Sequence, residues 1–281
     1  MPCWLTTKFI EDTKMEILRP EAFFNLASYR HRDLFAGCDY VWQALAEIPA
    51  YLSEYLESNV KGVGCWGRPL PQTVVLWEDK VWWDGYELLG GDVTKETFRV
   101  RIRGEETSLA TVLYAGAVLW DDRIFLAPGA VVEPGALIKG PTIIGAYTEV
   151  RQGAYIRGKC IVGDRCVIGH TTEMKSSIML DDAKAGHFAY IGDSILGGDC
   201  NLGAGTKLAN LKIKEGTVHL RISDRIIDSG MRKFGAIIGD RVQIGCNTVT
   251  NPGTLLGKGS LVLPVSSVRS GYYGANSVVS S

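Results

Sequence analysis

Residues 138–168 read IKGPTIIGAYTEVRQGAYIRGKCIVGDRCVI, and an apolar side chain returns at every sixth position of this stretch. The same period covers eleven consecutive positions from Trp120 to Leu180 and resumes from Ile238 to Val268, with Thr250 as the one polar member. An amphipathic helix needs a period of about 3.6 residues and a half-buried strand a period of about 2. A period of six instead fits a coil whose flat sides each carry one inward apolar residue.

Glycine often follows the sixth-position residue, as in Ile144-Gly145, Val162-Gly163 and Ile168-Gly169. Small residues suit the corners of such a coil, where positive φ is needed. This hexapeptide repeat resembles the left-handed parallel β-helix of acyltransferases. Three hexads make one triangular turn, so residues 18 apart stack at about the 4.8 Å strand spacing. We expect a mainly β fold, with a left-handed β-helix over residues 119–281.

Residues 1–118 lack the repeat and predict a small α+β domain. Apolar residues at intervals of three and four indicate helical pieces between residues 20 and 58. Short apolar runs separated by Gly and Asp indicate strands between residues 73 and 118. Six of the seven tryptophans lie between Trp42 and Trp120, which favours an aromatic core over a binding role for the Trp82-Trp83 pair.

The composition excludes several classes of protein. Lys and Arg total 30 against 31 for Asp and Glu, whereas a nucleic-acid binder needs a surplus of cations. No stretch approaches the roughly 18 apolar residues of a membrane span, and the first residues lack the pattern of a signal peptide. Seven scattered cysteines without a CxxC pair argue against a disulfide or zinc framework. We therefore expect a cytoplasmic protein.

The repeat is interrupted twice, and sites on solenoid proteins tend to lie at interruptions. The register slips around residues 186–193. Between residues 209 and 237 the period disappears, and alternating apolar residues on either side of Ser223-Asp224 predict a β-hairpin that leaves the stack. Such an arm either grips a neighbouring subunit or closes a site, and the sequence leaves both roles open.

Residues 155–210 carry a closer resemblance. The segments 173–175 (EMK), 184–193 (KAGHFAYIGD) and 201–206 (NLGAGT) look like the acetyltransferase half of bifunctional sugar-1-phosphate enzymes, and residues 228–240 are similar to the archaeal type. Those enzymes join a nucleotidylyltransferase domain to a β-helix that N-acetylates glucosamine 1-phosphate. The first 118 residues are too few for that nucleotidylyltransferase domain and lack its Gly-rich phosphate loop. We therefore expect no nucleotidylyltransferase activity.

The resemblance implies acetyl transfer from acetyl-CoA to the amine of an amino-sugar phosphate. This chemistry needs a base for the amine proton and stabilisation of the oxyanion. His187 stands at the family's catalytic His position, and an imidazole pKa near 6.5 suits a base at neutral pH. Tyr190, three residues further on, is expected to orient the acceptor or to hydrogen-bond the intermediate. No metal is expected in the transfer step.

Two cations are predicted to hold the phosphate of the acceptor. Arg157 and Lys175 lie one 18-residue turn apart and both follow an inward residue, so they should stack on the same outer side. Both match the family's phosphate-binding positions. Arg151 is a rival, but its spacing to Lys175 is 24 residues, which points it to another side. The resemblance also places Glu173 and Asn201 beside the acceptor.

The resemblance places Ala204, Asn210 and Cys246 along the acetyl-CoA channel. Because the flat coils of one subunit offer only a shallow groove, a deep site needs a neighbour, and a homotrimer is expected. An alternative is a catalytically inactive sugar-phosphate-binding or scaffold protein of the same fold. A zinc carbonic anhydrase of this fold needs three histidines, and only His170 and His187 are candidates to stack here.

Overall fold

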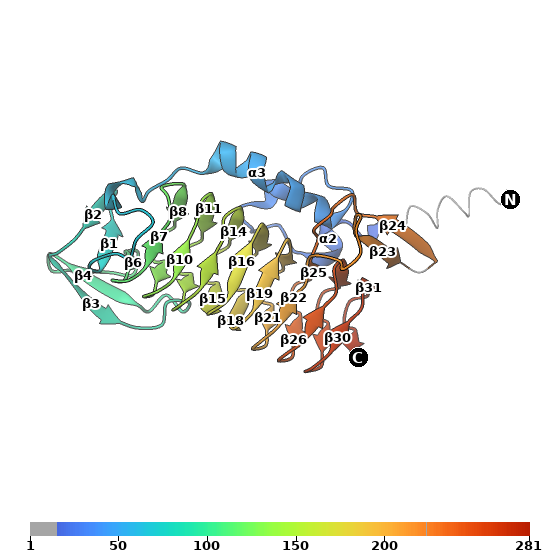
Figure 1. Ribbon diagram of the computed structural model, residues 1–281. Helices are drawn as coiled ribbons and strands as arrows, with labels where there is room; N and C mark the ends of the chain where they lie inside the picture. The colour runs from blue at the N-terminus through green and yellow to red at the C-terminus, as the bar shows by residue number, and fades with distance from the viewer. Residues whose placement is uncertain (1–15, 223) are drawn as a thin grey trace.

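Three parallel β-sheets form the sides of a triangular prism of about nine turns (Figure 1). The structure, a computed structural model, describes residues 16–222 and 224–281. Cys3 and the start of the chain, on which the signal-peptide prediction rests, lie outside these residues. The protein is mainly β and folds as a left-handed parallel β-helix, as predicted.

The chain visits the three faces of the prism in a fixed order. The strap face comprises β8 (Ile124–Leu126), β11 (Thr142–Ile144), β14 (Cys160–Val162), β17 (Ser177–Met179), β20 (Ile195–Leu196), β25 (Ala236–Ile238), β28 (Thr254–Leu256) and β31 (Gly271–Tyr273). The extended face comprises β6 (Thr111–Leu113), β9 (Val131–Val132), β12 (Glu149–Val150), β15 (Val167–His170), β18 (Lys184–His187), β21 (Asn201–Leu202), β26 (Gln243–Ile244), β29 (Leu261–Val262) and β32 (Val278–Val279). The open face comprises β7 (Val118–Leu119), β10 (Leu137–Ile138), β13 (Tyr155–Ile156), β16 (Glu173–Lys175), β19 (Tyr190–Gly192), β22 (Lys207–Leu208), β27 (Val249–Thr250) and β30 (Ser267–Val268).

The register confirms the 18-residue turn and locates the slip. Ile156 on β13 pairs with Met174 on β16, but Met174 pairs with Ile191, 17 residues on. The slip begins before the predicted position, because Ser176 adopts a left-handed conformation (φ 45°) and only five residues separate Met174 from the next inward residue, Met179.

Two of the residues expected to point inward do not. Leu119 is the fully buried inward residue of the first turn, whereas Trp120 is 48% exposed. Likewise Met179, rather than Leu180, faces the interior of the prism, and Leu180 packs in the apolar cluster outside the strap face. A shift of one residue reverses the direction of a side chain on a strand, so both predictions are wrong by one position.

Short helices of the N-terminal part lie along the strap face. They are α2 (Pro20–Phe23), η1 (Arg32–Phe35), η2 (Val41–Gln43), α3 (Ala44–Tyr55) and η3 (Lys61–Val63). Buried residues of these helices, among them Phe23, Trp42 and Ile48, form one cluster with outward residues of the strap face such as Ile161 and Ile195. The N-terminal helices therefore cover one whole side of the prism (Figure 1).

The predicted strands of residues 73–118 extend and cover another face. They are β1 (Val74–Trp77), β2 (Lys80–Trp82), β3 (Tyr86–Gly90), β4 (Arg99–Ile102) and β5 (Glu105–Thr107). The order β2-β1-β6-β9 continues the extended face, while β3, β4 and β5 form a small antiparallel sheet. Val100 and Ile102 of that sheet pack with Val112 and Val131 on the outside of the extended face. The predicted boundary at residue 118 thus divides elements that share a sheet and a core.

The predicted hairpin is present as β23 (His219–Ile222) and β24 (Arg225–Asp228), which pair antiparallel. One side of β23 does not project into solvent: Leu220 and Ile222 are buried in the cluster outside the strap face. The hairpin lies beside β31 at the C-terminal end of the prism (Figure 1).

Two general properties of the described residues bear on the sequence analysis. No helix in residues 16–222 and 224–281 is long and apolar enough to cross a membrane. The six cysteines of this part of the chain carry free thiols, four of them buried and Cys246 exposed. Burial raises the pKa of the Cys160 thiol to about 12, so it is not a nucleophile at neutral pH.

Candidate active site on the edge of the β-helix

His187 ends β18 and lies on the edge between the extended and open faces, which we name the His187 edge. His170, His187, Ala204 and Cys246 occupy the same place on this edge in successive turns. Each carbonyl oxygen of the first three accepts a hydrogen bond, at 2.8 to 3.0 Å, from the amide that follows the next member. His170 and His187 are also register partners, as predicted. The predicted base and two of the three predicted coenzyme-channel residues therefore form one column.

The backbone turns sharply just after this column. Phe188 adopts a left-handed conformation (φ 52°), as do Thr171, Gly205 and Asn247 in the same place on neighbouring turns. The turn leaves the imidazole of His187 exposed and sets the ring of Phe188 edge-on against His170, with 5.3 Å between ring centroids. His187 is thus accessible to a ligand from outside the prism.

The Ala204 amide is oriented differently from its neighbours. It donates to no other atom within residues 16–222 and 224–281, whereas the Gly205 amide donates to the His187 carbonyl oxygen at 3.0 Å. A free amide one turn from an exposed imidazole is the arrangement that an oxyanion requires.

The open face adjoins the His187 edge and carries four of the other predicted residues. Glu173 and Tyr190 point outward from register partners on β16 and β19. The Arg157 guanidinium donates to Oε1 of Glu173 at 2.7 Å, and this hydrogen bond raises the pKa of Arg157. The predicted phosphate ligand is therefore already paired with a carboxylate.

The second predicted phosphate ligand is paired more deeply. The Lys175 ammonium lies 2.6 Å from Oδ2 of Asp193, and the two side chains are only 15% and 13% exposed. Asn210 donates its amide to the same carboxylate and accepts from the Tyr190 hydroxyl at 3.3 Å. Burial is the first cause that raises the pKa of Tyr190, followed by the charge of Glu173. Tyr190 is thus a neutral hydrogen-bond donor at physiological pH.

Sequence reasoning missed the role of Asp193, the hub of this network. It follows Gly192 at the edge between the open and strap faces, which we name the Asp193 edge, and its φ of 44° turns the chain there. The pattern of a carboxylate 18 residues after Lys175 was the available signal, since that spacing places the two one turn apart.

The structure does not bring all predicted residues together within one chain. Asn201 points outward from the middle of the extended face, in register with Lys184 and Gln243. Asn210 lies on the Asp193 edge, on the opposite side of the open face from Ala204 and Cys246. The rival cation Arg151 is bound to Glu149 on the extended face and takes no part.

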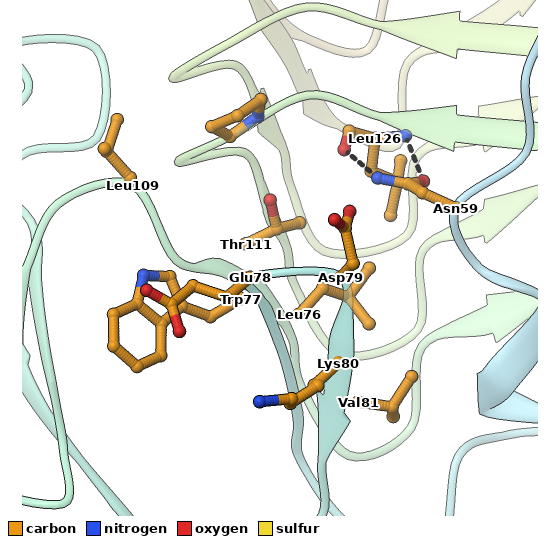
Figure 2. Close-up of a pocket in the computed structure, with 11 residues that line it drawn as sticks. Asn59, Leu76, Trp77, Glu78, Asp79, Lys80, Val81, Leu109, Thr111 and Leu126 are labelled. Carbon is orange, nitrogen blue, oxygen red and sulfur yellow. Dashed lines mark hydrogen bonds between the residues drawn. The ribbon is translucent and has the colours of Figure 1, made fainter.

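A hollow of about 390 Å³ lies elsewhere, beside the hairpin turn of β1 and β2 (Figure 2). None of the predicted site residues lines it. Its Asn59 side chain bonds both the amide and the carbonyl of Leu126, at 3.0 and 2.7 Å, and so anchors the N-terminal part to the first turn. Metal-ligand geometry is likewise lacking: residues 16–222 and 224–281 contain no group of three or more His, Cys, Asp or Glu that could hold an ion.

Comparison with known proteins bears on the same segment. Residues 138–229 match the family model described as the GMPPB C-terminal domain. The chain is 38% identical over 96 residues to the bifunctional sugar-1-phosphate nucleotidylyltransferase/acetyltransferase of Sulfurisphaera tokodaii, covering 34% of this chain and 24% of that protein. It is 42% identical over 94 residues to the bifunctional protein GlmU of Methanococcus vannielii, covering 34% of this chain and 22% of that protein. The β-helix resembles the acetyltransferase region of these bifunctional proteins.

The chain thus spans about a quarter of the length of these curated relatives. Among solved structures it is similar to perosamine N-acetyltransferase from Caulobacter crescentus, solved with CoA and GDP-perosamine, at 17% identity and a TM-score of 0.27 over 58% of this chain and 52% of that one. It is also similar to the polysialic acid O-acetyltransferase OatWY, at 13% identity and a TM-score of 0.34 over 56% and 80%. At these identities the likeness concerns the fold alone.

Proposed function

We propose that the chain transfers an acetyl group from acetyl-CoA to the amine of an amino-sugar phosphate, with His187 as the general base. The observation that carries the proposal is the column of His187, Ala204 and Cys246 on one exposed edge, with two cations on the adjoining open face. The similarity of this segment to bifunctional acetyltransferases supports the acyl chemistry.

In the proposed reaction the acceptor amine attacks the thioester carbonyl carbon and His187 takes up the amine proton. The oxyanion accepts a hydrogen bond from the Ala204 amide, which is free for it. The carbon–sulfur bond then breaks, and the leaving thiolate takes a proton to give free CoA. Tyr190, whose pKa is raised, donates a hydrogen bond to the acceptor. No step draws on a metal.

Phosphate binding would exploit the two ion pairs of the open face. Arg157 is 43% exposed on its side chain and its partner Glu173 35%, so the phosphate reaches this guanidinium first. Lys175 is held by Asp193 and adds its charge from one turn away. Asn201 and Glu173 would contact hydroxyl groups of the sugar from the two sides of the His187 edge.

A thiol-release assay over a panel of amino-sugar phosphates tests the reaction. Glucosamine 1-phosphate and its epimers should release CoA thiol from acetyl-CoA, and His187→Ala should abolish most of that release. Absence of thiol release with every acceptor, together with absence of acetyl-CoA binding in calorimetry, would refute the transferase. The chain would then be an inactive sugar-phosphate-binding or scaffold protein.

The site is proposed to form in a homotrimer, because its column lies on a convex edge. Exposed apolar side chains continue the surface around this edge over the C-terminal turns: Val249, Leu261, Leu263, Val265 and Val278. A partner that covers them would remove this apolar area from water and close the site. Analytical ultracentrifugation should show a trimer at micromolar concentration, and a stable monomer would contradict the shared site.

A further inference from the structure

A line of aromatic and cationic side chains continues the open face beyond the candidate site. Trp120, Lys139, Arg157 and Lys175 each follow an inward residue, on four successive turns. The amide of each of the first three donates to the carbonyl of the inward residue on the next turn at 2.8 Å, which fixes their alignment. The four side chains therefore point outward in one column, and only the last two belong to the site described above.

Lys139 is held differently from the other two cations. Its ammonium lies 4.5 Å from the centroid of the Trp120 ring and 5.4 Å from that of Tyr155. Arg157 and Lys175, by contrast, each bind a carboxylate. A cation held by ring faces keeps its charge available to an anion, because a ring quadrupole neutralises nothing.

The Trp120 ring remains accessible although one side meets Lys139. The side chain is among the exposed large apolar groups of the described chain, at 48%. Its neighbour on the other side is the segment that pairs with Leu119, where Gly67 donates to the Leu119 carbonyl at 2.9 Å. Gly67 has no side chain, and a Cβ there would meet only the Trp120 carbonyl oxygen, at 4.0 Å. The backbone thus approaches Trp120 without covering its ring.

We infer that this strip (Trp120, Lys139, Tyr155 and Arg157) binds the nucleotide of a nucleoside-diphosphate-linked amino sugar. The inference rests on the proposed function, since it places the sugar at His187. Three turns separate Lys175 from Trp120, about 14 Å along the axis. This span exceeds a single phosphate and accommodates a second phosphate at Lys139 and a base stacked on the indole. An exposed aromatic beside cations is the usual platform for a nucleobase next to its phosphates.

Isothermal calorimetry with UDP, ADP, GDP and dTDP tests the strip without depending on acetyl transfer. At least one nucleoside diphosphate should bind the full chain, more tightly than inorganic phosphate. Trp120→Ala should weaken that binding about five- to hundredfold, the effect of losing one stacked base, while Trp120→Phe should retain most of it. Tyr55→Ala, which removes an aromatic of similar exposure (52%) from the strap helices, should bind like the unaltered chain.

Failure of this inference is distinguishable from failure of the proposed function. No binding of any nucleoside diphosphate, or equal binding by Trp120→Ala with an unchanged circular dichroism spectrum, would overturn the nucleotide strip. Thiol release with amino-sugar 1-phosphates is measured separately and would be unaffected by that outcome. Conversely, a protein that binds a nucleoside diphosphate through Trp120 but releases no thiol would support the strip and contradict the transferase.

Discussion

Breaking the ion pair between Lys175 and Asp193 should destabilise the protein far more than breaking the pair between Arg157 and Glu173. The two pairs have nearly equal N–O distances, 2.6 and 2.7 Å, and lie on the same face. Their exposure differs: 15% and 13% for the first pair, 43% and 35% for the second. Loss of one partner from a fully buried pair costs about 3–5 kcal/mol, and an exposed pair is worth about 0–1 kcal/mol. For this slightly exposed pair, Asp193→Ala should lower the free energy of unfolding by about 2–3 kcal/mol.

Urea denaturation of both double-mutant cycles measures these free energies. We expect a coupling of about 1–3 kcal/mol between Lys175 and Asp193, and less than about 0.5 kcal/mol between Arg157 and Glu173. The single variant Asp193→Ala also leaves the Asn210 amide without its acceptor, so the coupling, rather than the single loss, isolates the ion pair. Equal couplings in the two cycles would refute the assignment of the difference to burial.

Three further predictions concern the site and the N-terminal part. His187→Ala should lower kcat by about 10²–10⁴-fold with little change in acceptor affinity, measured as steady-state thiol release; an unchanged kcat would exclude a general base here. Arg157→Ala should raise KM about 10- to 100-fold for a phosphorylated acceptor, by loss of a charge-assisted contact, and barely affect an acceptor without phosphate. Burial lowers the pKa of His31 to about 4, so its neutral form stabilises the fold above the unfolded pKa near 6.5, and this stability is lost as pH falls toward 4. Between pH 7 and pH 5 this loss should reach about 2 kcal/mol in chemical denaturation, and His31→Gln should remove that part of the slope.

The sequence predicted the repeating core better than its interruptions. Each inward position sees the same environment, so a residue such as Ile156 or Val162 is specified by a period that the whole stack enforces. Where one side of the prism is shortened, no apolar period records it, because the shortening depends on the left-handed backbone of Ser176. At the start of the stack the side of the first turn after Leu119 is longer by one residue, which exchanged the directions of Leu119 and Trp120.

The candidate site was predicted in part. Motif and spacing indicated His187, Arg157 and Lys175, and the register places the two cations one turn apart. The carboxylates that bind these cations were not anticipated, because an ion pair between turns depends on which rotamers the long side chains adopt. The alignment of His187 with Ala204 likewise required the 17-residue turns, which only the register supplies.

The pattern of outward residues indicates which faces of the prism are covered. On the strap face the residue before the inward one is apolar in turn after turn, as in Ile143-Ile144, Ile161-Val162 and Ile237-Ile238, and these outward residues are buried beneath the N-terminal helices. On the open face the outward residues are polar or aromatic, Glu173 and Lys207 among them. An apolar outward residue loses free energy in water, about 1.5–3 kcal/mol for a fully buried Ile, so a doublet that returns every turn requires a cover. With the strap face closed by the chain itself and the start of the extended face closed by β3 to β5, ligands and partner subunits must approach the turns around His187 through the open face and the later turns of the extended face.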